Sequence, residues 1–166
     1  MKILFLDDRD IRVRRFMEAC PIGLRRGSLT VAWEITVVRS AMAAIKALLD
    51  GPVGTAASYD VIFLDHDLND QRHGDQVPDR INNGLAVALF LAAWDVPTGK
   101  IIIHSTNDGA AQEMLALLLS AGYQAVHMKP DHDDFSPLIQ YMEGQVVNPT
   151  IIGESSSPTL TQEERP

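Results

Sequence analysis

Short apolar runs that stop abruptly at polar residues are the main pattern in this sequence. Continuous apolar runs of this length indicate strands that are buried on both faces, as in a parallel sheet. A further stretch, Val31–Val38, alternates less cleanly and contains Trp33 and Glu34, which predicts a strand at or near the sheet edge. The continuous runs, with the polar residues that follow them, are Ile3–Leu6 before Asp7-Asp8, Val61–Leu64 before Asp65-His66-Asp67, Ile101–Ile103 before His104-Ser105, and Ala125–Met128 before Lys129-Pro130.

Helical patterns separate these strands. Ser40 is a candidate N-cap, Gly122 a candidate stop signal, and Phe16 and Met17 are expected to face inward. A strand and then a helix recur five times, which predicts an α/β fold with a doubly wound, five-stranded parallel sheet. Ligands of such sheets bind beyond the carboxyl ends of the strands, where the polar clusters fall. The predicted helices are Ile11–Ala19, Ala41–Leu49, Leu85–Trp94, Ala110–Ala121 and Leu138–Met142.

The chain of 166 residues is long enough for one well-buried core. We expect a single domain over residues 1–147 and a disordered C-terminal tail over residues 148–166. Within the domain, Leu68–Asn83 is a long polar connection directly after a strand end. A loop of that length beside a candidate site is expected to be a mobile cover.

The charge of the chain narrows the class of ligand. A net charge of -8 argues against duplex nucleic acid, which is held chiefly by Lys and Arg. A small phosphate-containing ligand or an RNA terminus remains compatible with it. Residues 1–50 nevertheless carry nine Lys/Arg against six Asp/Glu. Arg12 and Arg15, with Arg25 and Arg26, could form an anion-facing patch, but a solvated helix face is the preferred interpretation.

Cys20 is the sole cysteine, which excludes an internal disulfide and a cysteine-rich zinc site. We expect it to be a small core residue at the end of the first helix. No apolar run approaches the ~18 residues of a membrane span. These features predict a cytoplasmic protein with no membrane partner.

Acidic residues at separate strand ends predict a metal site. The fold would bring Asp7, Asp8, Asp65 and Asp67 close together, with Lys129 nearby. Adjacent carboxylates repel one another unless a cation neutralises them, and hard oxygen ligands select Mg²⁺ or Mn²⁺. We therefore expect a divalent metal at Asp7, Asp8 and Asp65.

Two histidines add a second kind of chemistry to these strand ends. His66 and His104 supply imidazoles that either bind a metal or act as acid and base near neutral pH, and both alternatives stay open. The other histidines and the large aromatic residues are interpreted as ordinary surface or packing residues rather than ligands or base-stacking platforms. These are His73, His127, His132, Trp33, Trp94 and Tyr123.

The strand ends resemble those of the receiver domains of response regulators, which carry an acidic pair, an acceptor Asp, a Ser or Thr, and Lys-Pro. The matching residues are Asp7-Asp8, Asp65, Ser105 and Lys129-Pro130. The motifs Phe-Leu-Asp-Asp-Arg, Leu-Asp-His-Asp-Leu and His-Ser-x-Asn-x-Gly-Ala look like those of the cyclic-phosphate-processing receiver-like family. The resemblance implies a receiver (flavodoxin/CheY-like) architecture and a site proposed to process cyclic phosphates on RNA ends or nucleotides.

A second resemblance, to haloacid-dehalogenase-type phosphatases, implies individual roles. By that analogy Asp65 would be the nucleophile and Asp67 the acid or base. If the chain is a phosphoesterase, His66, Asp67 and His104 are expected to act in catalysis or ligation. The phosphoryl oxygens need hydrogen-bond donors and positive charge. The expected phosphate-binding residues are Ser105, Asn107, Lys129 and Arg9.

Three functions remain open from the sequence. The first is a metal-dependent phosphoesterase that acts on a cyclic phosphate. The second is a receiver switch in two-component signalling, in which Asp65 accepts a phosphoryl group from a partner kinase. The third is a non-catalytic domain that binds a nucleotide or a protein partner.

Overall fold

The computed structural model describes residues 1–20, 25–26, 29–30, 33–50, 59–68, 81–130 and 133–142. Residues 69–80 of the expected cover, and the expected tail from residue 148, lie outside the described residues, so both stay predictions. Among the described helices, none combines the length and apolarity that crossing a membrane requires. The elements are β1 (Lys2–Leu6), α1 (Asp10–Ala19), β2 (Arg25–Arg26), β3 (Leu29–Thr30), β4 (Glu34–Val38), α2 (Ala41–Leu49), β5 (Tyr59–Leu64), α3 (Gly84–Trp94), β6 (Thr98–Ile103), α4 (Asp108–Ser120), β7 (Gln124–His127) and α5 (Ser136–Met142).

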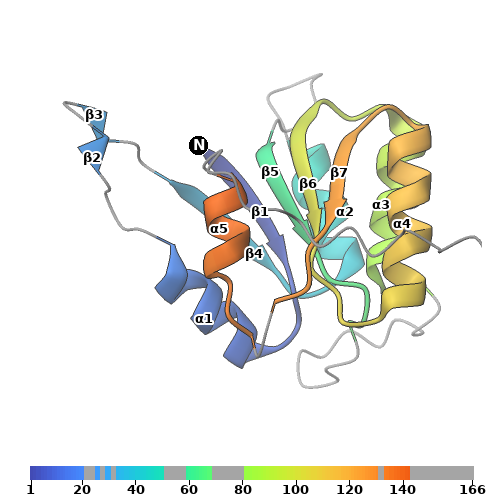
Figure 1. Cartoon of the computed structure of the whole chain (residues 1–166). Coiled ribbons are helices and arrows are strands. Elements are labelled where there is room, and N and C mark those ends of the chain that lie inside the picture. The colour runs from blue at the N-terminus through green and yellow to red at the C-terminus, as the bar shows by residue number, and fades with distance from the viewer. Residues whose placement is uncertain are drawn as a thin grey trace, which may run out of the picture.

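One all-parallel sheet forms the centre of the domain (Figure 1). Its strands follow the order β4-β1-β5-β6-β7, which is the strand order of flavodoxin-like folds. The predicted doubly wound, five-stranded parallel sheet is therefore confirmed. The strand expected over Val31–Val38 does lie at an edge, although β4 begins only at Glu34.

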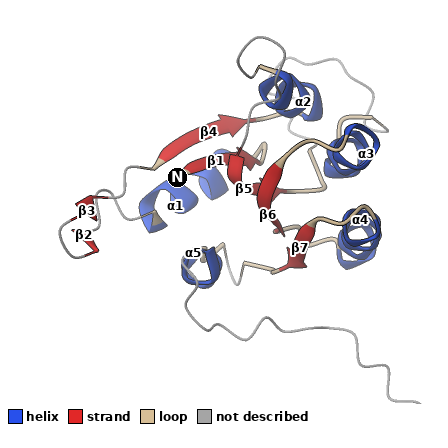
Figure 2. Ribbon diagram, turned by 90° about the horizontal axis from the view of Figure 1, so that it is seen from above, coloured by secondary structure: helices blue, strands red, loops and turns tan. Residues whose placement is uncertain are grey.

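Helices cover both faces of the sheet. Figure 2 shows α1 and α5 on one face, and α2, α3 and α4 on the other. Successive residues of a strand point to opposite faces. Phe5 and Phe63 therefore join the core under α1 and α5, where Phe5 stacks on Phe16 with ring centroids 3.9 Å apart. Leu6 and Leu64 join the larger core under α2, α3 and α4.

Polar residues set the ends of several helices. The side chains of Ser40, Asn83 and Asn107 each accept a hydrogen bond from the backbone N–H three residues on, at the start of α2, α3 and α4. Gly122, just after α4, adopts φ +88°, which favours glycine. Ser40 and Gly122 thus act as the sequence predicted.

The environments of some side chains differ from expectation. Met17 is 42% exposed, because the inward stripe of α1 runs through Arg12, Val13 and Phe16 and leaves it outside. Trp94 is 69% exposed at the end of α3 and lies outside the buried core, although its ring stacks on that of Phe90 with centroids 5.8 Å apart.

Other expectations about core residues are confirmed. Cys20 is buried, and Trp33 and Tyr123 pack against the core. The short antiparallel pair of β2 and β3 was not predicted, because two-residue strands leave no periodic pattern.

Two glycines in the first turns of α3 and α4 test the packing at this sheet edge. A Cβ at Gly84 would overlap the carbonyl oxygen of Asp65, whereas at Gly109 the nearest atom is Oδ1 of Asn107 at 3.9 Å. We expect Gly84→Ala to lower the free energy of unfolding by about 1–3 kcal/mol, as overpacking does. Gly109→Ala should leave it unchanged or raise it by up to about 1 kcal/mol. Urea denaturation measures both, and equal effects would contradict the close approach of α3 to β5.

Candidate active site

The register of the sheet aligns the residues that follow three neighbouring strands. Main-chain hydrogen bonds continue past the strands, from Asp65 N to Leu6 O and from His104 N to Leu64 O, both 3.0 Å long. Asp7, Asp65 and His104 therefore form one row across the ends of β1, β5 and β6. By the alternation of strand side chains, this row faces α1, on the same side as Phe5 and Phe63.

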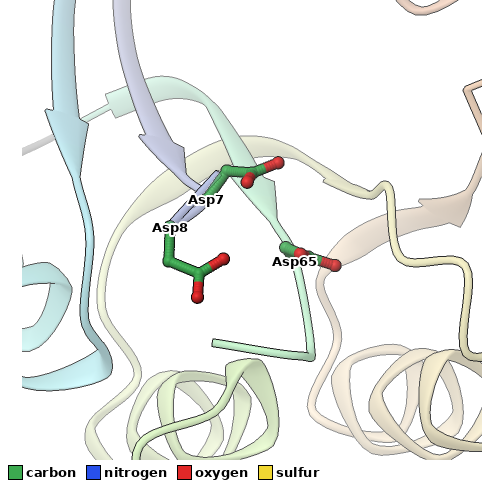
Figure 3. A group of neighbouring side chains, drawn as sticks. All are labelled: Asp7, Asp8 and Asp65. Carbon is green, nitrogen blue, oxygen red and sulfur yellow. The ribbon is translucent and has the colours of Figure 1, made fainter. Parts of the chain in front are cut away.

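Three carboxylates gather at the ends of β1 and β5 (Figure 3). Asp7, Asp8 and Asp65 are buried, and each offers a carboxylate oxygen within 4.8 Å of the others. Oδ2 of Asp7 is buried with no hydrogen-bond partner in the described part of the chain. Asp67 lies outside this group and is 44% exposed, so the structure brings together three of the four expected carboxylates.

Arg12 is a site residue that the sequence reasoning missed. Its side chain is 2% exposed, so the interpretation of this position as a solvated helix face is wrong. Nη1 donates a hydrogen bond to Oδ2 of Asp65 (2.8 Å), and Nε lies 3.3 Å from Oδ2 of Asp7. Nη2 donates to the carbonyl oxygen of His104 (2.8 Å). The signal was present, because Arg12 shares the inward stripe of α1 with Val13 and Phe16.

The charges of these residues fit a divalent cation. The carboxylates of Asp7, Asp8 and Asp65 contribute three negative charges, and Arg12 contributes one positive charge, which leaves a formal charge of -2 when all are ionised. Oxygen-only ligands suit Mg²⁺ or Mn²⁺. The residues present therefore fit such an ion, and the unsatisfied Oδ2 of Asp7 supports the same assignment.

Burial alters the protonation of the carboxylates. It raises the pKa of Asp7 to about 7, with Arg12 opposing the shift and Asp65 adding to it. Burial also raises the pKa of Asp65, while Arg12 and the backbone N–H of His66 oppose that shift. Both carboxyl groups are therefore costly to ionise unless a cation joins them.

His104 lies beside Asp65 in this row and is fully buried. Burial first, and then the charge of Arg12, lower the pKa of His104 well below its usual range. Its ring is therefore neutral at pH 7, and Nε2 donates to the carbonyl oxygen of Leu6 (3.2 Å). Nδ1 is left as an acceptor, 3.4 Å from Nη2 of Arg12. The ring also stacks on Phe5, with centroids 5.0 Å apart.

His66 and Asp67 form a separate, more exposed pair. Nδ1 of His66 lies 2.7 Å from Oδ1 of Asp67. Nδ2 of Asn107 donates to the same oxygen at 3.4 Å. An isolated antiparallel β-bridge between Asp67 and Asn83 connects this segment to the start of α3. An imidazole held at Nδ1 by a carboxylate presents Nε2 as the proton-transferring atom.

The residues expected to bind phosphate have different surroundings. Ser105 is buried, and its Oγ accepts a hydrogen bond from Asn107 N (3.2 Å). Lys129 pairs with Asp108, the first residue of α4, at 2.8 Å. The side chain of Arg9 is exposed, while its backbone N–H donates to Oδ1 of Asp7 (2.9 Å).

The histidines interpreted as ordinary include one that the structure describes. Nε2 of His127 lies 3.0 Å from the carbonyl oxygen of Ser105, and the side chain is half-buried. His73 and His132 lie outside the described residues.

Comparison with known proteins gives a family match. The family model of the cyclic-phosphate processing receiver domain matches residues 2–120. Among curated proteins, none matches the chain significantly.

Solved structures similar to this chain include several response regulators. The N-terminal domain of a response regulator/sensory box/GGDEF 3-domain protein from Carboxydothermus hydrogenoformans is 17% identical, with a TM-score of 0.52, over 87% of this chain and 92% of that one. A two-component response regulator from Legionella pneumophila is 16% identical, with a TM-score of 0.48, over 87% and 99%. The bacteriophytochrome response regulator AtBRR is 18% identical, with a TM-score of 0.47, over 89% and 96%. At 17% identity, the likeness to the Carboxydothermus hydrogenoformans domain, whose TM-score exceeds 0.5, concerns the fold alone.

The raised pKa of Asp7 gives the metal-free protein a pH-dependent stability. The pKa is 3.8 in an ordinary carboxyl group and about 7 in the folded state, so the folded state binds more protons between these values. Raising the pH through this window therefore lowers the free energy of unfolding. We expect the thermal midpoint of chelator-treated protein to fall as pH rises from about 4 to about 7, and Asp7→Asn to flatten the fall. Asp95→Asn, at an exposed position, is the control; a parent midpoint that rises over this range would contradict the assignment.

Proposed function

Because the chain belongs to the cyclic-phosphate processing receiver family, we propose that it is a metal-dependent phosphoesterase that opens a cyclic phosphate. One observation carries the proposal: a buried carboxylate cluster, with one charge balanced by Arg12, lies at the strand ends that also bear the partly exposed His66–Asp67 pair. The substrate is a small cyclic nucleotide or a cyclic phosphate at an RNA terminus.

The metal would be held by Asp7, Asp8 and Asp65. A divalent cation held there would supply Lewis-acid polarisation of a phosphoryl oxygen and would lower the pKa of water. The carboxylates are supplied by strand ends whose positions are fixed by main-chain hydrogen bonds, such as Asp65 N to Leu6 O. The sheet therefore holds the backbone from which these carboxylates extend.

His66 and Asp67 would move the protons. Opening a cyclic phosphate requires removal of a proton from the attacking water and delivery of a proton to the departing ring oxygen. His66 can do both in turn, because Asp67 holds Nδ1 at 2.7 Å and leaves Nε2 for the exchange. Asn107 donates to Asp67 and so helps to fix the pair.

Binding of the phosphate would fall to the N-terminal end of α4. Asn107 is the N-cap of this helix, and backbone N–H groups at a helix start attract anions. Lys129 lies at the same end, paired with Asp108, and would exchange this carboxylate for a bound phosphate. Arg9, exposed beside Asp8, can add a second positive charge.

The proposal gives Asp65 the role of a ligand rather than a nucleophile. Oδ1 accepts from His66 N (2.9 Å) and Oδ2 accepts from Arg12 (2.8 Å), so both oxygens already bear hydrogen bonds in a buried site. A receiver switch needs this carboxylate to attack phosphorus. A stable acyl phosphate on Asp65 after incubation with a small phosphodonor would support the switch instead.

The metal claim is tested by thermal unfolding. Mg²⁺ or Mn²⁺ at about 100 times its dissociation constant should stabilise the folded state by about 2.7 kcal/mol through mass action and raise the midpoint. Asp8→Asn should remove most of the rise, because it removes one ligand. Asp60→Asn, at an exposed position on β5, should keep it. A parent midpoint unchanged by either ion would leave the cluster without its metal.

The proton-transfer claim is tested by Asp67→Asn. The variant should still bind metal and substrate, while turnover falls by roughly 10²–10⁴-fold, the usual contribution of one general acid or base. Asp95→Asn is the matched control, because its left-handed backbone also tolerates Asn. Cleavage of a cyclic phosphate by Asp67→Asn at the parent rate would rule out this role for the pair.

A further inference from the structure

Arg12 has the largest fully buried side chain in the described part of the chain. Burial of a guanidinium group is costly unless its donors are paired. Here Nη1 donates to Asp65 and Nη2 donates to the carbonyl oxygen of His104, both at 2.8 Å. Nε faces Asp7 at 3.3 Å and Asp133 at 3.5 Å. A single side chain from α1 thus contacts the residues that follow β1, β5 and β6.

His104 contacts Arg12 through both its backbone and its ring. Its backbone carbonyl accepts from Nη2, and its Nδ1 lies 3.4 Å from the same nitrogen. The ring is fixed in turn by the carbonyl oxygen of Leu6 and by stacking on Phe5. The side chain is fully buried, and each ring nitrogen already has a neighbour.

We propose that Arg12 is the positioning residue of the carboxylate cluster, and that His104 is the residue that positions Arg12. The inference rests on the proposed function and adds to it the cause of the ligand geometry. Arg12 fixes the orientation of Asp65 through one short hydrogen bond, and its Nε lies 3.3 Å from Oδ2 of Asp7 as an ion pair without a hydrogen bond. His104 then acts through Arg12, neither as a metal ligand nor as a proton carrier.

A positioning role and a charge-compensating role of Arg12 predict opposite changes in metal affinity when its side chain is removed. If Arg12 only neutralised charge, its removal would leave a more negative cluster that binds a cation more tightly. If it positions Asp65, its removal should weaken binding. Lysine separates the two further, because it keeps the charge but lacks the planar fork that contacts Asp65 and the His104 carbonyl together.

The substitution His104→Gln distinguishes a role in positioning Arg12 from a role in carrying a proton. The glutamine amide can donate to Leu6 O and accept from Arg12, as the neutral imidazole does. It cannot carry a proton at neutral pH. Leucine fills the space but offers neither contact.

The experiment measures two quantities for Arg12→Met, Arg12→Lys, His104→Leu and His104→Gln. One is the dissociation constant for Mn²⁺ alone, from calorimetry, and the other is kcat on a nucleoside 2′,3′-cyclic phosphate. We expect Arg12→Met, Arg12→Lys and His104→Leu to weaken Mn²⁺ binding by roughly 10–100-fold, the usual effect of losing a residue that orients ligands. His104→Gln should bind and turn over close to the parent. Arg14→Met, an exposed arginine on the same helix, is the control and should match the parent.

Two results would overturn the inference. Unchanged or tighter Mn²⁺ binding by both Arg12 variants would assign Arg12 to charge compensation. Equal damage by His104→Gln and His104→Leu would assign chemistry to the ring itself. If circular dichroism shows that Arg12→Met does not fold, Arg12→Lys together with His104→Leu and His104→Gln tests the inference. A parent protein that binds Mn²⁺ but cleaves no cyclic phosphate would contradict the proposed function. The Mn²⁺ dissociation constants of the variants would still test the inference about Arg12 and His104.

Discussion

The hydrogen bond between the buried guanidinium of Arg12 and the carboxylate of Asp65 is the contact on which the candidate site depends. It joins α1 to the end of β5 at 2.8 Å, in a region from which water is largely excluded. Carboxylates that end buried strands would otherwise repel one another and favour protonation. With Arg12 in place, the cluster keeps a formal charge suited to a single divalent cation, and Asp65 lies in the row of residues that faces α1.

The strand ends carry two layers with different chemistry. The buried layer holds Asp7, Asp65 and His104, which lie in the row that faces α1. The more exposed layer holds His66 and Asp67, with Asn107 at the start of α4. In the proposed function, this separation would place the metal ligands in the buried row and the proton-transfer groups where a substrate can reach them. It is also the feature that distinguishes the proposed phosphoesterase from a receiver switch.

Most of the fold could be predicted from the sequence, because apolar runs and helical stripes follow directly from burial. The positions of Asp7, Asp8 and Asp65 followed from the rule that parallel strands end at one edge. The role of Arg12 did not follow, because the stripe of α1 gives the direction of a side chain but not the depth at which a charge is tolerated. That depth depends on how α1 packs against the ends of β1, β5 and β6, which the sequence does not specify residue by residue.

The dependence of side-chain environment on tertiary packing also explains why Lys129 and Trp94 differ from expectation. The expected proximity of Lys129 to the carboxylates assumed that strand ends alone decide where a long side chain goes, whereas Lys129 pairs with Asp108 across the start of α4. The exposure of Trp94 depends on where α3 ends relative to its neighbours. Local patterns specify elements well, but side-chain partners across elements depend on tertiary packing.

The most direct measurement of the central claim is phosphorus NMR of the parent protein with Mn²⁺ and a panel of cyclic phosphates. The panel contains nucleoside 2′,3′-cyclic phosphates, 3′,5′-cyclic nucleotides and cyclic oligonucleotides. The proposed function expects the signal of at least one cyclic phosphate to be replaced by that of its opened phosphate ester, and the reaction to stop when a chelator is added. Persistence of every cyclic phosphate signal with Mn²⁺ present, together with an acyl-phosphate signal after addition of a small phosphodonor, would contradict it.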